Sequence, residues 1–306
     1  MERLEVLAFN ALPAAISEDM WTHQYDQMSN QIACIKFPGK ALFRTNGSES
    51  HLFGLEPNFG CCTANFNQAW PKFALSAFMH SEDTVINGIP VPSELKTDDK
   101  HIKIETSYPF ENTFKYTVDA KKSFTFKIRI PSFAENLTVN GEIAAADELS
   151  FEIGAGEKLE INVSFDVSLT VDKRPNDLNT VRFGSLVFSL PVKYETKMHE
   201  YEKDGVERKF PYCDYELIPV SDWNYAYSTD ELEIRRSGVT DVPFSSKNPP
   251  VTIKTGVKKI NWGFEDGYDT VCSKVPESTQ ALGSEEEIIL YPYGCAKLRM
   301  TEIPKI

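Results

Sequence analysis

Strict alternation of apolar and polar residues runs through the middle of this chain and limits its fold more than any other feature. The clearest case is residues 123–130, where every second side chain is apolar. A period of two is typical of a strand that buries one face. Other stretches with strand character lie at residues 102–106, 113–118, 137–140, 149–153, 158–165 and 168–171. Short strands at this spacing predict an antiparallel β-sandwich.

A polar segment at residues 173–177 predicts a boundary between domains. A second all-β module with longer loops is expected beyond it. The expected strands of that module lie at residues 180–190, 216–220, 223–227, 251–255, 287–291 and 296–300.

Before the first sandwich, two segments carry helical spacing of apolar residues. Residues 1–17 are interrupted by Pro13, and residues 63–80 contain Pro71, which should kink or restart that helix. Thr63 is the expected N-cap of the second helix, and a short strand is expected at residues 21–25. Two helices and a polar loop cannot form an independent core. Since residue 1 already lies in a helical pattern, we expect the chain to be a piece of a longer protein.

Composition excludes several classes of protein. The 306 residues carry a formal net charge of −13, which disfavours binding to the phosphate backbone of nucleic acids. No apolar run approaches the roughly 20 residues that cross a bilayer, and the first residues lack a signal-peptide pattern. The six cysteines are too sparse for a disulfide scaffold. A cytoplasmic protein with reduced thiols is expected.

Two of these cysteines, Cys61 and Cys62, are adjacent. Adjacent cysteines rarely form a disulfide with each other because the ring is strained. They suit a soft metal, or a reactive thiolate beside a second ligand. A thiolate is also favoured at the beginning of a helix. The alternative is that both are inert packing residues, as most free cysteines are.

The residues around this pair resemble a known family. Phe-Gly-Cys-Cys-Thr-Ala-Asn at 59–65, followed by Gln-Ala-Trp-Pro-Lys-Phe at 68–73, resembles the cysteine-pair motif of the β-L-arabinofuranosidase-type glycoside hydrolases, family 127. Three further stretches that fit the same family are residues 3–14, 221–225 and 290–299. The resemblance spans the whole chain, yet it corresponds only to the C-terminal portion of the family's architecture.

The resemblance implies a mainly β fold with two antiparallel β-sandwich domains, preceded by the last helices of an (α/α) barrel. The domains expected are residues 1–82, a remnant of the barrel with the cysteine pair, residues 83–172, the first sandwich, and residues 173–306, the second sandwich. A separate chain could supply the missing barrel.

The resemblance also implies a mechanism that depends on zinc. Cys61 would be the catalytic nucleophile and a zinc ligand, with Cys62 as a second ligand, and the glycoside would be cleaved with retention of configuration. The remaining zinc ligands and the acid/base glutamate of the family lie in barrel helices that have no counterpart here. We therefore expect this chain alone to be catalytically incomplete.

Five further residues are candidates for contact with a sugar. Glu56 could ligate zinc or act as an acid/base, although a solvated loop carboxylate is the simpler interpretation. Gln24 and Tyr25 lie in an amide-rich segment that could hydrogen-bond to sugar hydroxyls, and loop polarity explains that segment equally well. Trp223 and Tyr225 could form an aromatic platform for sugars, or could be core residues.

Two hypotheses of function follow. The first is the C-terminal part of a zinc- and cysteine-dependent retaining glycoside hydrolase that acts on β-L-arabinofuranosides or related glycosides. The second is a non-catalytic β-sandwich protein that binds carbohydrate or docks against a barrel. Both expect a glycan partner, and neither expects nucleic acid or a membrane.

Overall fold

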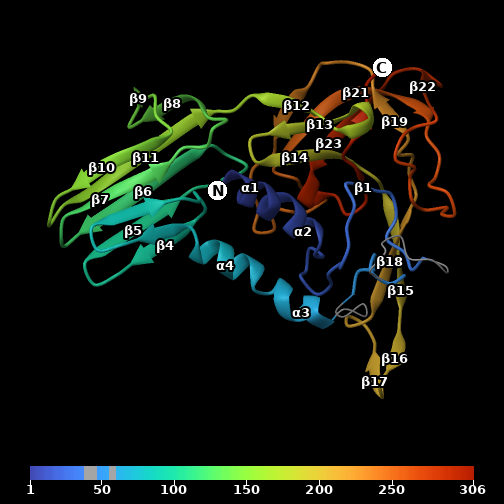
Figure 1. Cartoon of the computed structure of the whole chain (residues 1–306), viewed down its shortest axis with the longest axis horizontal. Coiled ribbons are helices and arrows are strands. Elements are labelled where there is room, and N and C mark those ends of the chain that lie inside the picture. Colours follow the sequence, from blue (N-terminus) through green and yellow to red (C-terminus); the bar gives the residue numbers. More distant parts are fainter. Residues whose placement is uncertain (38–46, 55–59) are drawn as a thin grey trace. The chain divides into compact units, whose positions relative to one another are not determined.

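The computed structural model describes residues 1–37, 47–54 and 60–306. The fold is mainly β, as the alternation predicted, with several sheets and a few short helices (Figure 1). Two compact units form from interleaved segments. Unit 1 comprises Met1–Ala8, Gln68–Leu169 and Phe183–Ser185, and unit 2 comprises Phe9–Asn67, Thr170–Arg182 and Leu186–Ile306. These units do not test whether residues 1–82 derive from a barrel, so the predicted domain division stays a prediction.

Unit 1 contains a four-stranded and a six-stranded sheet. The first sheet has the order β10 (Glu148–Ile153), β7 (Phe124–Arg129), β3 (Thr84–Asn87) and β2 (Phe78–His80). The second has the order β4 (Ser93–Lys96), β5 (Lys100–Glu105), β6 (Thr113–Ala120), β11 (Lys158–Asp166), β8 (Glu135–Val139) and β9 (Glu142–Ile143).

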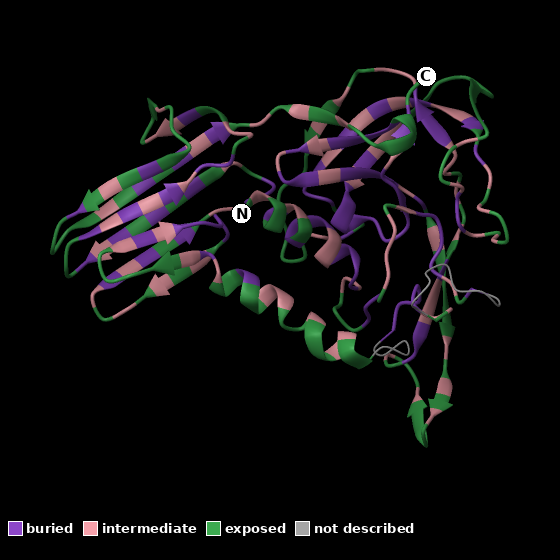
Figure 2. Ribbon diagram, in the orientation of Figure 1, coloured by how far each residue is buried: buried purple, intermediate pink, exposed green. Residues whose placement is uncertain are grey.

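The alternation read from the sequence separates buried from exposed positions in these strands. Phe124, Phe126 and Ile128 of β7 are buried, and the residues between them are partly exposed (Figure 2). One pairing differs from the expected antiparallel pattern, because β3 pairs with β7 in parallel. Residues between these strands form part of the six-stranded sheet, so the chain returns to the four-stranded sheet through a long crossover rather than a hairpin.

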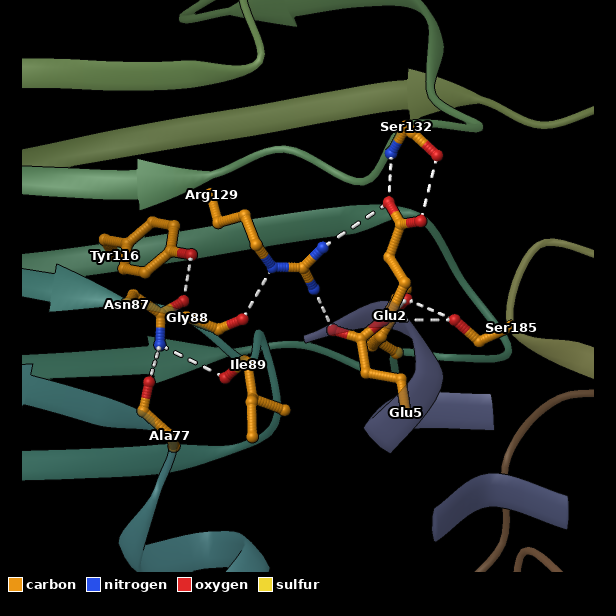
Figure 3. Close-up of polar contacts among 11 residues, drawn as sticks. Glu2, Glu5, Ala77, Asn87, Gly88, Ile89, Tyr116, Arg129, Ser132 and Ser185 are labelled. Carbon is orange, nitrogen blue, oxygen red and sulfur yellow. Dashed lines mark hydrogen bonds and ion pairs between the residues drawn. The ribbon is translucent and has the colours of Figure 1, made fainter. Parts of the chain in front are cut away.

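Two sets of polar contacts lie inside unit 1 (Figure 3). The Tyr116 hydroxyl of β6 donates a hydrogen bond of 2.7 Å to Oδ1 of Asn87 in β3, which links the two sheets. Near the N-terminus, the Glu5 carboxylate is fully buried and forms an ion pair with Arg129 of β7. Tyr108 donates a hydrogen bond of 2.8 Å to the other oxygen of that carboxylate. The N-terminal helix is therefore attached to the sandwich through a buried charge pair.

Unit 2 is built on an 11-stranded sheet system. Its main path is β1 (Asn30–Gln31), β24 (Arg299–Met300), β14 (Leu186–Pro191), β23 (Glu286–Pro292), β21 (Val251–Asn261) and β19 (Tyr225–Tyr227). The strands that pair off this path are β12 (Leu169–Lys173), β13 (Leu178–Phe183), β20 (Glu233–Arg236), β22 (Ser278–Ala281) and β25 (Ile303–Pro304). Short 3₁₀ helices lie at Pro175–Asp177 and Tyr293–Cys295.

A separate ribbon in unit 2 pairs β15 (Tyr194–His199) with β18 (Asp214–Pro219). The hairpin of β16 (Tyr201–Lys203) and β17 (Val206–Arg208) lies at its far end (Figure 1). The ribbon is tied to the N-terminal part of unit 2 by backbone bridges from Cys34 to Leu217 and from Phe53 to Tyr215.

The helices depart from the sequence prediction in detail. The first consists of α1 (Glu2–Val6), a π-helical segment (Leu7–Ala11) and α2 (Leu12–Ala14), with Pro13 tolerated in the first turn of α2. The second predicted helix is divided into α3 (Gly60–Phe66) and α4 (Ala69–Leu75). The break precedes Pro71, because proline is accommodated in a first turn.

Two local predictions were wrong. Thr63 is not an N-cap, since α3 already begins at Gly60. The strand expected at residues 21–25 is reduced to isolated bridges from His23 to Ile16 and Gly54. That segment instead connects several elements through its side chains. No helix in the described ranges is long and apolar enough to cross a membrane.

Candidate functional site

The cysteine pair lies in the first turn of α3, in unit 2. Cys61 is exposed and Cys62 is half-buried, whereas the other four cysteines of the chain are buried. The Asn65 side-chain amide donates a hydrogen bond of 2.8 Å to the carbonyl of Cys61. Inert packing therefore describes the four buried cysteines and does not describe Cys61.

Tyr25 belongs to the same cluster as the two cysteines. Its phenol is partly desolvated, and the charges of Cys61, Cys62 and Asp26 add to this effect, so that its pKa lies above the usual value. Tyr25 retains 36% of its accessible surface. The structure thus brings together three of the residues that the sequence singled out, namely Tyr25, Cys61 and Cys62. It adds Asp26, which the sequence analysis did not consider.

The Cys62 thiol does not follow the expectation that a helix start favours the thiolate. Burial raises the pKa of Cys62 to about 11, and its hydrogen bond with Cys61 and the charges of Cys61 and Asp26 act in the same direction. Desolvation and negative neighbours disfavour an anionic sulfur. Without a cation, Cys62 is therefore protonated at neutral pH.

His23 connects the segment that carries Tyr25 to α3. Its imidazole is buried, and Nε2 lies 3.1 Å from the hydroxyl oxygen of Thr63. The ring also stacks on Phe66, with centroids 6.1 Å apart and planes inclined by 10°. His23 therefore joins the segment that carries Tyr25 to α3 through one polar contact and one ring contact.

Gln24 points away from the cysteine pair into the interior. Its amide nitrogen donates hydrogen bonds to Oε1 of Gln31 at 3.1 Å, to Sγ of Cys34 at 3.3 Å and to the carbonyl of His51 at 3.0 Å. Only 4% of its surface is accessible. The donors of this side chain are therefore used within the protein, and its predicted contact with a sugar has no support in this arrangement. Glu56 lies outside the described residues.

Arg299 is the largest fully buried side chain among the residues that the structure describes, and the sequence analysis did not single it out. Its guanidinium donates hydrogen bonds of 2.8 Å to the carbonyl of Met28 and 3.1 Å to Oε1 of Gln27. It also lies over the Tyr293 ring, 3.9 Å from the centroid. Arg299 and Tyr293 both belong to the 290–299 motif. This motif therefore supports the segment that follows Tyr25.

The proposed aromatic platform is divided between core and surface. Tyr225 is buried, and its hydroxyl donates a hydrogen bond of 3.2 Å to Glu286. Trp223 is half-buried and packs against Trp262 and Phe264, with ring centroids 6.2 and 5.8 Å away. The core interpretation is thus correct for Tyr225.

Whether the pair fits zinc depends on the donor set. Sulfur ligands suit zinc, which takes four donors in a tetrahedral structural site. Among the residues that the structure describes, no group of three or more His, Cys, Asp or Glu side chains could hold a metal ion. Cys61 and Cys62 would provide two donors, so the described residues do not make a zinc site by themselves.

A family model matches one part of the chain, outside the cysteine pair. Residues 85–153 match the family model described as β-L-arabinofuranosidase, GH127 middle domain. This segment lies within the sandwich of unit 1. A search of curated proteins gave no match.

Solved structures share the fold over essentially the whole chain. The GH127 β-L-arabinofuranosidase from Geobacillus stearothermophilus T6 is similar at a TM-score of 0.61 and 15% identity, covering 100% of this chain and 46% of that enzyme. A structure described as a glycoside hydrolase gives a TM-score of 0.65 at 17% identity, covering 99% of this chain and 48% of that one. A GH127 β-arabinofuranosidase gives 0.53 at 15% identity, covering 100% and 46%.

The fold is thus that of the β-domains of glycoside hydrolases. Residues 85–153 match the model of one family, and the resemblance to family 127 is confirmed. The chain spans less than half the length of the solved structures that it matches.

Proposed function

We propose that this chain is the C-terminal part of a cysteine- and zinc-dependent retaining glycoside hydrolase that acts on β-L-arabinofuranosides or related glycosides. The observation that carries the proposal is the accessible cysteine pair beside Tyr25, on a chain whose fold resembles the β-domains of family 127. Thiols reserved for packing would be buried, as the other four are.

In this proposal Cys61 is the nucleophile. Its sulfur would attack the anomeric carbon, forming a carbon–sulfur bond while the glycosidic carbon–oxygen bond breaks, and water would later release the sugar with retained configuration. Tyr25 would orient the sugar beside the sulfur. Because Cys61 is the more exposed of the two thiols, it is the one that a substrate can reach.

We also propose that zinc binds at the cysteine pair, with further ligands from outside the described residues. Two thiols from adjacent positions leave half of a tetrahedron to be filled. The acid that protonates the leaving group is also assigned to no described residue. We therefore propose that the chain alone is inactive, and that a barrel, from the same protein or from a partner chain, completes the site.

Two measurements test this proposal. The purified chain should release no product from an aryl β-L-arabinofuranoside, and measurable turnover would overturn the proposed inactivity. Zinc binding at equilibrium, followed by metal analysis after dialysis, should decrease in Cys61→Ser and Cys62→Ser and should be unchanged in Cys272→Ser, which alters a buried thiol. Equal binding by all three variants would contradict the role of the pair.

A further inference from the structure

A second candidate binding site lies in unit 2, where the β15–β18 ribbon meets the segment at residues 17–22. A pocket of about 220 Å³ opens there. This volume equals about seven water molecules at ~30 Å³ each. It is below the ~300–1,000 Å³ typical of sites for drug-sized ligands, so a single small ring fits better than an extended molecule.

Five of the thirteen residues that line the pocket are aromatic. Phe53 is buried, whereas Trp21 and Phe210 retain 45% and 70% of their accessible surface at its rim. The Trp21 ring packs edge-on against Tyr212, with centroids 5.3 Å apart and planes inclined by 84°. An indole held in this way offers a flat apolar surface to a ligand. Aromatic rings that face water cost free energy, and a ligand that covers them recovers part of that cost.

Polar groups lie among these rings. Lys297 is 6% exposed, and its ammonium donates one hydrogen bond of 2.7 Å to the carbonyl of Pro13, which leaves two further protons to donate. The Tyr194 hydroxyl has no hydrogen-bond partner among the residues that the structure describes. Glu18 and Asp19 also line the pocket and can only accept hydrogen bonds when ionised.

This combination selects a class of ligand. A sugar hydroxyl both donates and accepts hydrogen bonds, so it can use an acceptor carboxylate and a donor ammonium together. The carbon–hydrogen face of a sugar ring can lie on an indole, which an anion or a strongly polar solute cannot do as well. Two carboxylates against one ammonium give the lining a net negative charge, which disfavours acidic sugars.

We propose that this pocket binds one neutral sugar residue of a glycan, with Trp21 as the stacking platform. Its lining contains neither Cys61, Cys62 nor Tyr25. The choice of arabinose as the first sugar to test rests on the proposed function, whereas the pocket itself does not depend on a catalytic cysteine.

The test is a titration of the whole chain with methyl β-L-arabinofuranoside and with neutral methyl xyloside and galactoside, followed by ligand-observed NMR and calorimetry. We expect saturable binding of at least one of these glycosides. Stacking on Trp21 predicts that Trp21→Ala weakens the binding by about tenfold. Phe210→Ala should weaken it less, because Phe210 is more exposed.

Matched variants separate this site from the alternatives. Trp223→Ala removes another partly exposed tryptophan of unit 2 that is absent from the pocket, and should leave binding unchanged. Cys61→Ser should also leave it unchanged. Lack of binding by any neutral glycoside, tighter binding of a galacturonic acid oligomer, or binding that is lost in Cys61→Ser and retained in Trp21→Ala would each overturn the proposal. Loss of zinc binding or hydrolysis would not affect it.

Discussion

Each of the two units contains an arginine that is at least partly buried, and the two arginines are held by different partners. In unit 1, Arg129 forms an ion pair with the fully buried carboxylate of Glu5. In unit 2, Arg299 is fully buried, and its hydrogen bonds go to carbonyls, the Gln27 amide and the Tyr293 hydroxyl. Among the described residues, Arg299 forms no ion pair with a carboxylate.

This difference indicates a different structural role for each arginine. The Glu5–Arg129 pair joins two elements of unit 1, and a well-packed apolar pair could do the same. Arg299 instead positions a loop, because its donors reach the backbone carbonyls of Met28, Ala296 and Lys297 together. That loop begins two residues after Tyr25. The second arrangement therefore supports the segment that follows Tyr25 and is harder to replace.

The largest effect is expected from Arg299→Met. Its removal takes a charged donor away from three backbone carbonyls, the Gln27 amide oxygen and the Tyr293 hydroxyl, and we expect a loss of about 4 kcal/mol in the free energy of unfolding. Urea unfolding monitored by tryptophan fluorescence reports mainly on unit 2, which contains Trp21, Trp223 and Trp262. Arg235→Met, at an exposed ion pair, is the control. A loss of less than about 1 kcal/mol would show that carbonyl contacts of this kind contribute little.

A smaller effect is expected from Glu5→Gln in unit 1. The change leaves the partly buried Arg129 with only the more distant Glu2 carboxylate, at 3.7 Å, and we expect a cost of about 3 kcal/mol. Because the pair serves to join elements, the double variant Glu5→Leu with Arg129→Met should recover part of that loss. The same urea experiment, with circular dichroism as the signal, measures both. A double variant less stable than either single variant would show that the two arginines are equally irreplaceable.

Asp214 in β18 is a buried carboxylate without a strong partner, and it should make the stability of the protein depend on pH. Burial raises its pKa to about 6, while the Tyr201 hydroxyl, at 3.5 Å, lowers it only weakly. The folded protein thus binds an extra proton between pH 3.8 and about 6, and stability decreases as the pH rises through this window. Asp214→Asn should remove this decrease and stabilise the protein at pH 7 by about 1 kcal/mol. Thermal unfolding at pH 4, 5, 6 and 7 measures the difference. A difference that does not change with pH would refute this assignment.

The smallest effect is expected at a surface pair of unit 1. Lys158 and Asp119 are 2.6 Å apart, with side chains 75% and 40% exposed. Solvent screens such a pair, so Lys158→Ala should change stability by less than about 0.5 kcal/mol. A larger change, measured in the same urea experiment, would mean that exposure is a poor guide to the value of charge pairs in this protein.

Much of the fold could be predicted because strands are recorded locally in the sequence. The alternation at residues 123–130 corresponds to β7, with its apolar residues buried. The parallel pairing of β3 with β7 could not be predicted, because it joins segments separated in the chain by three strands of the six-stranded sheet. Periodicity identifies the buried face of a strand and says nothing about its neighbour.

The candidate site was predicted less completely. Cys61, Cys62 and Tyr25 were singled out, and the structure brings them together, while Gln24 beside Tyr25 is buried in another network. Adjacent residues point in different directions along an extended segment, so composition alone could not assign them. Arg299 lies in the 290–299 motif that the sequence analysis noted. An arginine is nevertheless expected at the surface unless its buried partners are known.

The sequence by itself determined the strand pattern, the cysteine pair and the resemblance to a family, since all three depend on residues close together in the chain. Only the tertiary structure decided which side chains share an environment. The proximity of Tyr25 to the cysteines, the burial of Arg299 and the aromatic pocket at Trp21 each join segments far apart in sequence. Burial and electrostatic shifts depend on the distances between such segments, and no local pattern contains those distances.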